Sequence, residues 1–283
     1  MLRRCLGCLA AVVFLAMPIV ANAQGEYLDI YRVKVKPEKS AEFNALTKKW
    51  VDANRRYNGD HWLTLETMYG EGDVYVFTST RSSYADIDKA NEATMGAARK
   101  AFGPQTEKII QDFGSCLASS RSELRRRRWD LSRKAPADAA AYAKLIGESR
   151  YLRTTAVHVR PGRVADFEAL LKDLKAAGEK AANTQPVFVS QVIEGTKGTT
   201  FYVSTLRSSM AGFDNNPSMK DILGEEGYKK FLQGNADFVE EADSAIFRFS
   251  PELSNPPEDI VAVAPGFWRT KPTAPAAVAK PKE

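Results

Sequence analysis

The sequence repeats itself, and this repeat restricts the possible folds more than any other feature. Residues 27–46 align with residues 151–170 at a constant offset of 124, and nine of the twenty positions are identical. Unrelated segments of ordinary composition would share about one or two. Two later pairs of blocks keep the same order at offsets of 126 and 122: 79–83 with 205–209, and 122–132 with 244–254. The chain therefore contains a tandem duplication of one structural unit.

Each copy has the hydrophobic pattern of a βαββαβ unit. Apolar residues alternate through residues 27–35, which predicts a strand, and Pro37 ends it because proline cannot donate a hydrogen bond to the ladder. A helical pattern follows, then two strand patterns around a glycine-containing turn, a second helical region interrupted by glycine and proline, and a last strand. The later strands are expected at 62–68, 74–80 and 124–129, and at 187–193, 200–205 and 245–249. This order predicts an α+β fold of two tandem ferredoxin-like domains that form a pseudo-symmetric α+β barrel.

The first residues are typical of a secretory signal peptide. Arg3 and Arg4 precede an apolar stretch that is too short to span a bilayer, and an A-x-A sequence ends at Ala23. We therefore expect residues 1–23 to be a signal peptide and the mature protein to be periplasmic or secreted. No stable membrane anchor is expected to remain after cleavage.

The other boundaries follow from the repeat. The first domain is expected over residues 24–132, a linker with a short helix over 133–148, and the second domain over 149–254. Residues 255–283 are rich in proline, alanine and lysine, and we expect an irregular, disordered tail there. Phe267 and Trp268 are the exception, because they could dock onto the second domain.

Charge and cysteine content exclude several kinds of partner. The formal charge of +5 falls to +3 without Arg3 and Arg4, which is too little to favour nucleic acid. Only Cys116 lies beyond the signal peptide, so no internal disulfide can form, and we expect this thiol to be buried. With two histidines, no clustered ligand spacing and no nucleotide-binding motif, neither a metal nor a cofactor is expected. The sequence does not decide between a monomer and a homo-oligomer.

The start of each copy carries a longer motif, V-x-V-[KR]-P-x-[KR] followed by A-[ED]-F-x-A-L. This motif resembles the dimeric α+β barrel superfamily, in particular its NIPSNAP-like and antibiotic-biosynthesis-monooxygenase-like groups, and the resemblance covers most of 26–132 and 151–254. It implies two ferredoxin-like units packed together around a lumen that often holds a ligand. Members include cofactor-free oxygenases, haem-degrading enzymes and small-molecule isomerases, and the fold does not choose among them. The haem-degrading branch is known for a set of Asn, Trp and His residues. It is disfavoured here, because the first strands carry no Asn at lumen positions and no His falls in a predicted helix.

Strand alternation assigns residues to the two faces of each first strand. The residues expected to face the helices are Val33, Val35, Val157 and Val159. The residues expected to face the lumen are Ile30, Arg32, Lys34, Thr154, Ala156 and His158. His158 is the candidate catalytic residue, because a neutral imidazole can transfer protons near neutral pH, although a lone histidine in a strand is more often structural. Arg32 and Lys34 are candidate ligand-binding residues, although a wet lumen or hydrogen bonds between the domains would explain the same polarity.

Two further sets of arginines stand out. Arg81 and Arg207 are matched by the repeat at a strand-to-helix junction, where they could bind an anionic ligand or tie down the end of the strand. The four arginines of residues 125–128 are expected in a strand, where alternate side chains point to opposite faces. We interpret this run as a cluster of salt bridges rather than as a site for an acidic ligand.

These features favour an exported barrel protein that binds a small ligand or a partner between its two domains. The alternative is a cofactor-independent oxygenase or isomerase that acts on a small molecule, for example an aromatic one, with His158 as the proton-transfer group. A lumen lined by His158 and aromatic side chains would favour the enzyme. A lumen filled by its own side chains would favour a structural or interaction role.

Overall fold

The computed structural model describes residues 25–181 and 185–269, and each copy forms the expected βαββαβ unit. The first copy consists of β1 (Tyr27–Val35), η1 (Pro37–Lys39), α1 (Ser40–Arg56), β2 (Leu63–Tyr69), β3 (Val74–Arg81), α2 (Tyr84–Phe102), η2 (Gly103–Gln105), α3 (Thr106–Ser115) and β4 (Leu117–Arg127). The second consists of β5 (Tyr151–Val159), α5 (Val164–Lys180), β6 (Phe188–Glu194), β7 (Thr199–Arg207), η3 (Met210–Phe213), α6 (Met219–Phe238) and β8 (Val239–Phe249). The linker forms α4 (Ala139–Glu148), and η4 (Pro251–Leu253), α7 (Glu258–Val263) and α8 (Pro265–Trp268) follow the second copy.

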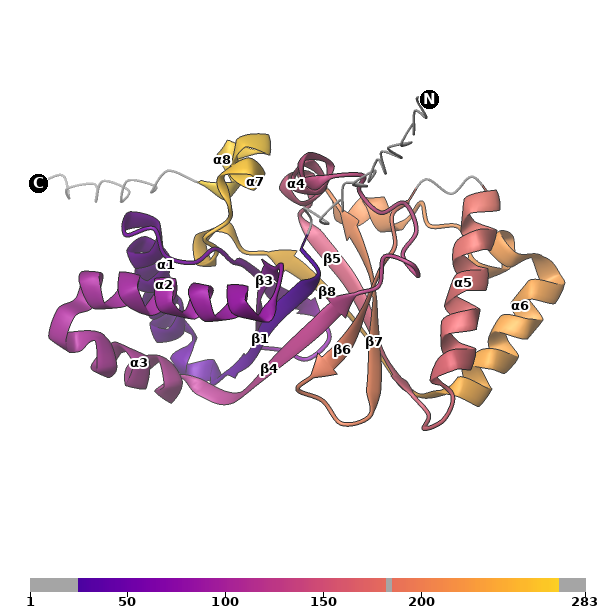
Figure 1. Ribbon diagram of the computed structural model, residues 1–283, viewed down its shortest axis with the longest axis horizontal. Helices are drawn as coiled ribbons and strands as arrows, with labels where there is room; N and C mark the ends of the chain where they lie inside the picture. Colours follow the sequence, from indigo (N-terminus) through magenta and orange to yellow (C-terminus); the bar gives the residue numbers. More distant parts are fainter. Residues whose placement is uncertain (1–24, 182–184, 270–283) are drawn as a thin grey trace, which may run out of the picture.

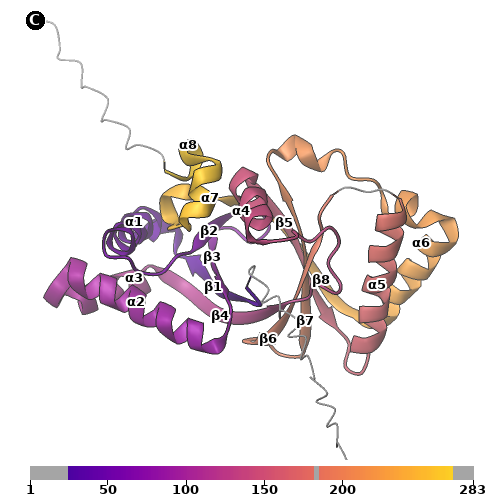
Figure 2. The ribbon, with the colours of Figure 1, turned by 45° about the horizontal axis from the view of Figure 1, so that its top comes forward.

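The eight strands close into one barrel, as the duplication predicts. Within each copy the strands are antiparallel and follow the ferredoxin-like order, β4-β1-β3-β2 and β8-β5-β7-β6. The copies join edge to edge through the pairs β2–β8 and β4–β6. The helices of the two copies lie on opposite sides of the barrel (Figures 1 and 2). Because a closed barrel leaves no strand edge unpaired, each copy supplies the edge partners that the other needs.

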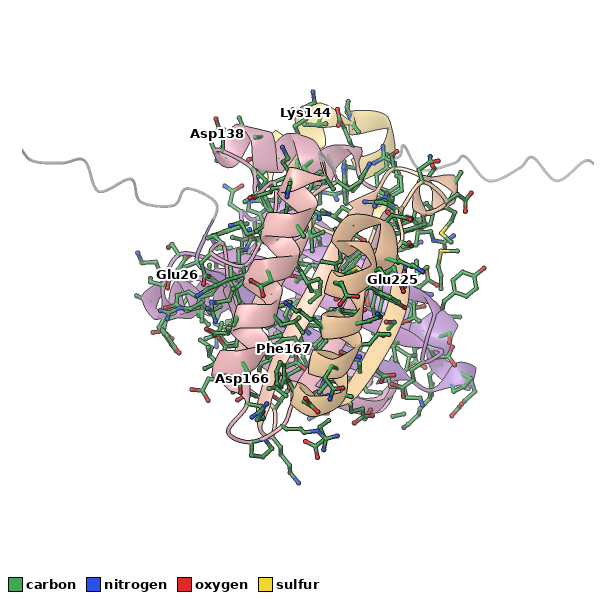
Figure 3. The ribbon with its side chains drawn as sticks, turned by 90° about the vertical axis from the view of Figure 1, so that its right-hand side faces the viewer. Glu26, Asp138, Lys144, Asp166, Phe167 and Glu225 are labelled. Carbon is green, nitrogen blue, oxygen red and sulfur yellow. The ribbon has the colours of Figure 1, made fainter. Side chains whose placement is uncertain are left out.

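The faces of the first strands agree with the alternation in the sequence. Val33 and Val35 pack against Phe43 of α1, and Val157 packs in the same way against Phe167 of α5. In the second copy, α5 and α6 lie side by side over the outer face of the sheet (Figure 3). The opposite face of every strand therefore points into the lumen of the barrel.

The last strand of each copy is longer than the sequence pattern indicates. β4 begins at Leu117 and β8 at Val239, and the added residues are mostly exposed. They show no apolar alternation because burial does not hold them in place; hydrogen bonds of the ladders with β1 and β5 do. Glycine interrupts the second helical region of each copy, as the pattern predicts: the φ angles of Gly103 and Gly224 are 55° and 69°.

The C-terminal segment up to Arg269 is folded, which corrects the expectation of an irregular tail from residue 255. α7 packs on α4, and the indole of Trp268, 1% exposed, donates a hydrogen bond of 3.1 Å to the carbonyl oxygen of Gly147. Gly147 allows this close approach, since a Cβ atom there would lie 2.5 Å from the Cβ of Val263. The expectation was wrong because it rested on the high proline, alanine and lysine content of residues 255–283 as a whole. The apolar residues that pack lie in the part before Arg269. Residues 270–283 of the expected tail lie outside the described residues.

The expected signal peptide, residues 1–23, also lies outside the described residues. Within 25–181 and 185–269, no helix combines the length and the apolar character of a bilayer-spanning segment. Cys116 is buried and has a free thiol, as predicted.

Candidate ligand-binding site

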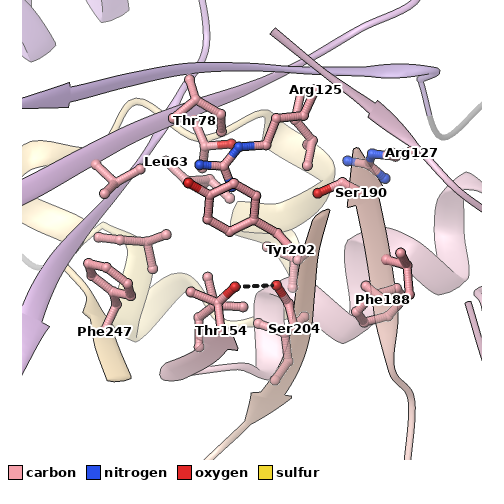
Figure 4. A pocket seen from close by; sticks show the side chains of 18 of the residues that line it. Leu63, Thr78, Arg125, Arg127, Thr154, Phe188, Ser190, Tyr202, Ser204 and Phe247 are labelled. Atoms are coloured by element: carbon pink, nitrogen blue, oxygen red, sulfur yellow. Dashed lines mark hydrogen bonds between the residues drawn. The ribbon is translucent and has the colours of Figure 1, made fainter. Parts of the chain in front are cut away.

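A cavity occupies the half of the barrel lumen that lies next to α4. It offers about 170 Å³ to the centres of water-sized molecules, and one water needs roughly 10–15 Å³ on this measure, so several waters or a small organic molecule would fit. All eight strands contribute to the wall, and Tyr142 and Ile146 of α4 cover it. Most of the wall is made of Leu, Ile, Val and Phe side chains (Figure 4). The polar side chains of the strand wall are Arg32, Thr78, Arg125, Arg127, Thr154, Ser190, Tyr202 and Ser204.

A buried ionic cluster closes the cavity on the side away from α4. The side chain of Glu123 is fully buried and forms ion pairs with Arg121 and Arg125. The guanidinium carbon of Arg125 lies 3.3 Å from the centroid of the Tyr202 ring, in a cation–π contact (Figure 4). Burial raises the pKa of the Tyr202 hydroxyl, which donates to Glu123 at 3.4 Å. The side chains of this cluster therefore fill the lumen on the side of the cavity away from α4.

Arg127 is the guanidinium of the cavity that has no ionic partner among the described residues. It is 8% exposed, and its Nη2 donates to the hydroxyls of Thr80 at 3.0 Å and Tyr142 at 2.7 Å. Its Nε is buried without an acceptor, and so is Nε1 of Trp129, which also lines the cavity. Buried donors without an acceptor are rare in folded proteins, because each retains the cost of losing its water.

The candidate residues of the lumen are divided between the cavity and the far end of the barrel. Arg32 lines the cavity, but it forms an ion pair with Glu71. Lys34 lies beyond the cavity and pairs with the same carboxylate, and hydrogen bonds from Lys34 and Arg32 lower the pKa of Glu71 to about 2. His158 does not line the cavity; its Nδ1 lies 3.0 Å from the hydroxyl of Thr200.

Arg81 and Arg207 lie on the helix-facing side of their strands, and neither lines the lumen cavity. Arg81 forms ion pairs with Asp60 at 2.6 Å and Asp29 at 3.3 Å, which agrees with a role in tying down the strand end. Among the described residues, the guanidinium of Arg207 donates to neutral acceptors, and Arg207 lines a separate pocket on the outside of the barrel.

The run of arginines at residues 125–128 contains the residue that sequence reasoning missed. Salt bridges were the expected role, and Arg125, Arg126 and Arg128 do form them. Arg127 forms none among the described residues. Alternation placed Arg125 and Arg127 on one face of the strand, but only the register of β4 against β1 and β6 identifies that face as the lumen.

Comparisons with known proteins show a likeness of fold. No protein-family model matches the sequence, and no curated protein matches it. Among solved structures, the chain is similar to an anthrone oxidase-like protein, with a TM-score of 0.49 and 16% identity over 81% of this chain and 93% of that one. It is also similar to a mutant chlorite dismutase from Candidatus Nitrospira defluvii in complex with cyanide (TM-score 0.47, 9% identity, 86% and 97% covered). A heme-binding protein from Thermus thermophilus has a TM-score of 0.44 and 10% identity over 81% and 93%. Likenesses this distant transfer no activity.

The described residues that line the cavity do not offer a free side chain of the kind that holds a haem iron. Haem iron is held by His, Cys, Met or Tyr side chains. No His, Cys or Met is among the described residues that line the cavity. Its two tyrosine hydroxyls are engaged, that of Tyr142 by Arg127 and that of Tyr202 by Glu123. In the same described part of the chain, no three His, Cys, Asp or Glu side chains are grouped to hold a metal ion.

Proposed function

We propose that the protein binds a small organic molecule in the lumen cavity, with an apolar body against the strand wall and an anionic group beside Arg127. The buried, unpaired guanidinium of Arg127 is the observation that carries this proposal. A buried charge is costly unless an opposite charge and hydrogen bonds accompany it. A bound carboxylate would supply both, next to a wall that is otherwise mostly apolar.

The aromatic groups around Arg127 support the same chemistry. The guanidinium carbon lies 4.6 Å from the ring centroid of Tyr142 and 5.2 Å from that of Trp129. These rings attract the guanidinium through cation–π contacts but carry no net opposite charge. The ligand class that fits is a small aromatic or aliphatic acid.

The cavity lining supports binding more than catalysis. An oxygenase or isomerase without a cofactor needs a group that accepts a proton from its substrate. None of the described residues that line the cavity is His, Asp, Glu or Cys, and His158, the proposed proton-transfer group, lies outside it. The enzymatic alternative therefore has no specific observation in its favour.

Replacing Arg127 with methionine tests the proposal. Benzoate and the neutral benzyl alcohol serve as paired probes, with affinity measured by isothermal titration calorimetry. Hydrogen bonds to a charged group contribute about 1.5–3 kcal/mol, so benzoate should bind about ten- to a hundredfold more weakly to the variant, and benzyl alcohol should bind as before. Arg126→Met is the matched control, since Arg126 points outward and pairs with Glu26. Equal benzoate affinity for the wild type and Arg127→Met would contradict the proposal, and so would no benzoate binding to the wild type at millimolar concentration.

We propose further that the protein is exported, on the basis of Arg3, Arg4, the apolar stretch and the A-x-A sequence at Ala23. The mature protein should begin at Gln24, since a signal peptidase cleaves after the last small residue of that site. Mass spectrometry of the protein purified from its native cells would measure this end. An intact N-terminus on a membrane-bound protein would count against export by cleavage.

A further inference from the structure

Equivalent arginines of the two copies, Arg81 and Arg207, differ in whether a carboxylate neutralises them. Arg81 pairs with Tyr27 in the ladder of the first copy, and Arg207 pairs with Tyr151 at the same place in the second. In the first copy, Asp60 and Asp29 neutralise Arg81. Although burial by itself lowers the pKa of Arg81, these two carboxylates outweigh it and raise that pKa.

The described residues of the second copy supply no such counter-charge to Arg207. Arg153 occupies the position of Asp29, since Asp29 pairs with Ser79 and Arg153 with Thr205. The two copies thus carry residues of opposite charge at this position. Arg207 is 6% exposed, and its hydrogen-bond acceptors are two carbonyl oxygens and an amide oxygen. Burial lowers its pKa, and no carboxylate of the described residues acts against that effect.

The same arginine lies beside an open pocket. In the first copy α2 begins directly after its N-cap Ser83, whereas in the second the short η3 comes first and α6 starts only at Met219. Between α5, the start of α6 and the outer face of the sheet, a pocket offers about 290 Å³ to the centres of water-sized molecules. Its interior wall is formed by apolar side chains of α5, β7 and α6, among them Leu171, Val203 and Ile222.

The charged side chains of this pocket all have one sign. Arg133, Arg153, Lys175 and Arg207 line it, and no Asp or Glu is among its described lining residues. Arg133 is 7% exposed and donates to the carbonyl oxygen of Gln185 at 3.2 Å, while Glu179 is the carboxylate that acts on its charge. Lys175 donates to the carbonyl oxygen of Asp130 at 3.1 Å. Two buried arginines and two further cations therefore meet at one apolar pocket.

We infer that this outer pocket is a second binding site, for an amphipathic anion whose apolar chain lies between α5 and the sheet and whose carboxylate or phosphate head pairs with Arg207 and Arg153. The external anion takes the place that Asp29 and Asp60 hold in the first copy. The site is separate from the lumen cavity, since Arg153 and Arg207 lie on the outer face of the sheet and the two described linings share Val189 alone.

Backbone amide NMR of the mature chain, titrated with octanoate, octyl phosphate or octanol, tests the site. Either anion should shift the amides of Arg153 and residues 205–216, the better binder identifies the head group, and octanol should not shift them. Arg153→Asp, which restores the charge of the first copy, should weaken anion binding at these amides by about tenfold or more. It should keep the thermal midpoint of the free protein at or above that of the wild type. Lys197→Asp, an equal change of charge at an exposed turn, should bind like the wild type.

Three results would overturn the inference. The first is that neither anion shifts the amides around Arg207 at millimolar concentration, and the second is that Arg153→Asp binds like the wild type. The third is that shifts are confined to amides of the lumen wall, which would belong to the cavity proposed above. Arg127→Met separates the two sites, since it should leave the shifts around Arg207 unchanged whether or not the lumen binds an acid.

Discussion

Replacing Trp268 with alanine is expected to lower the free energy of unfolding by about 3–5 kcal/mol, because truncating a buried aromatic side chain removes its contacts and leaves a cavity. The indole is 1% exposed and lies edge to face against Phe249, with ring centroids 5.6 Å apart, and against Phe267 at 4.9 Å. The substitution also removes the hydrogen bond to Gly147 at the end of α4.

Thermal unfolding of the purified protein measures this effect. For a domain of this size each kcal/mol shifts the midpoint by roughly 2–4 °C, so a decrease of roughly 6–20 °C is expected. Leu232→Ala is the control, since Leu232 is 49% exposed on α6 and its truncation should cost about 0.5 kcal/mol or less. Equal midpoints for the two variants would mean that the C-terminal segment does not dock on the barrel.

Glu123→Gln should produce the second large effect, a loss of about 3–5 kcal/mol in the free energy of unfolding. The carboxylate is fully buried and pairs with Arg125, whose side chain is 12% exposed, and with Arg121. The amide has nearly the same shape but no charge, so the guanidinium of Arg125 would stay buried without a counter-charge. Most of the loss therefore comes from the arginine that remains rather than from the glutamate removed.

Urea unfolding of two further variants tests whether the loss of stability comes from the arginine that is left without a counter-charge. Glu66→Gln breaks the exposed pair between Glu66 and Arg248 and should cost about 1 kcal/mol or less. The double variant Glu123→Leu with Arg125→Met removes both buried charges and should regain most of the stability, since an apolar replacement of a buried pair is often neutral. A loss for Glu123→Gln as small as that for Glu66→Gln would show that water reaches the cluster.

The position of α4 links the first prediction to the cavity. α4 covers the lumen through Tyr142 and Ile146, and α7 and Trp268 hold it from outside. Tyr142 also accepts the hydrogen bond from Arg127. We therefore expect Trp268→Ala to weaken benzoate binding as well, because a loosened α4 would no longer close the cavity or orient the guanidinium.

Much of the architecture could be predicted from the order of residues alone. The repeat and its periodicities determined two βαββαβ units and a barrel, because strand alternation, proline and glycine act through local backbone geometry. The same alternation determined that Ile30, Arg32 and Thr154 face the lumen, where all three line the cavity. It also kept Arg125 and Arg127 on one face of β4.

The tertiary structure alone decided which of these residues share a site. Strand alternation places His158 and Lys34 on the lumen face of their strands. Glu123, Arg125 and Tyr202 fill the barrel on the side of the cavity away from α4, and His158 and Lys34 do not line the cavity. Arg127 belongs to the same run as three paired arginines and is distinguished only because no carboxylate of the described residues reaches it. Ion pairs, cavities and the docking of Trp268 depend on distances between residues far apart in the chain, and the local periodicity of a sequence carries no information on such distances.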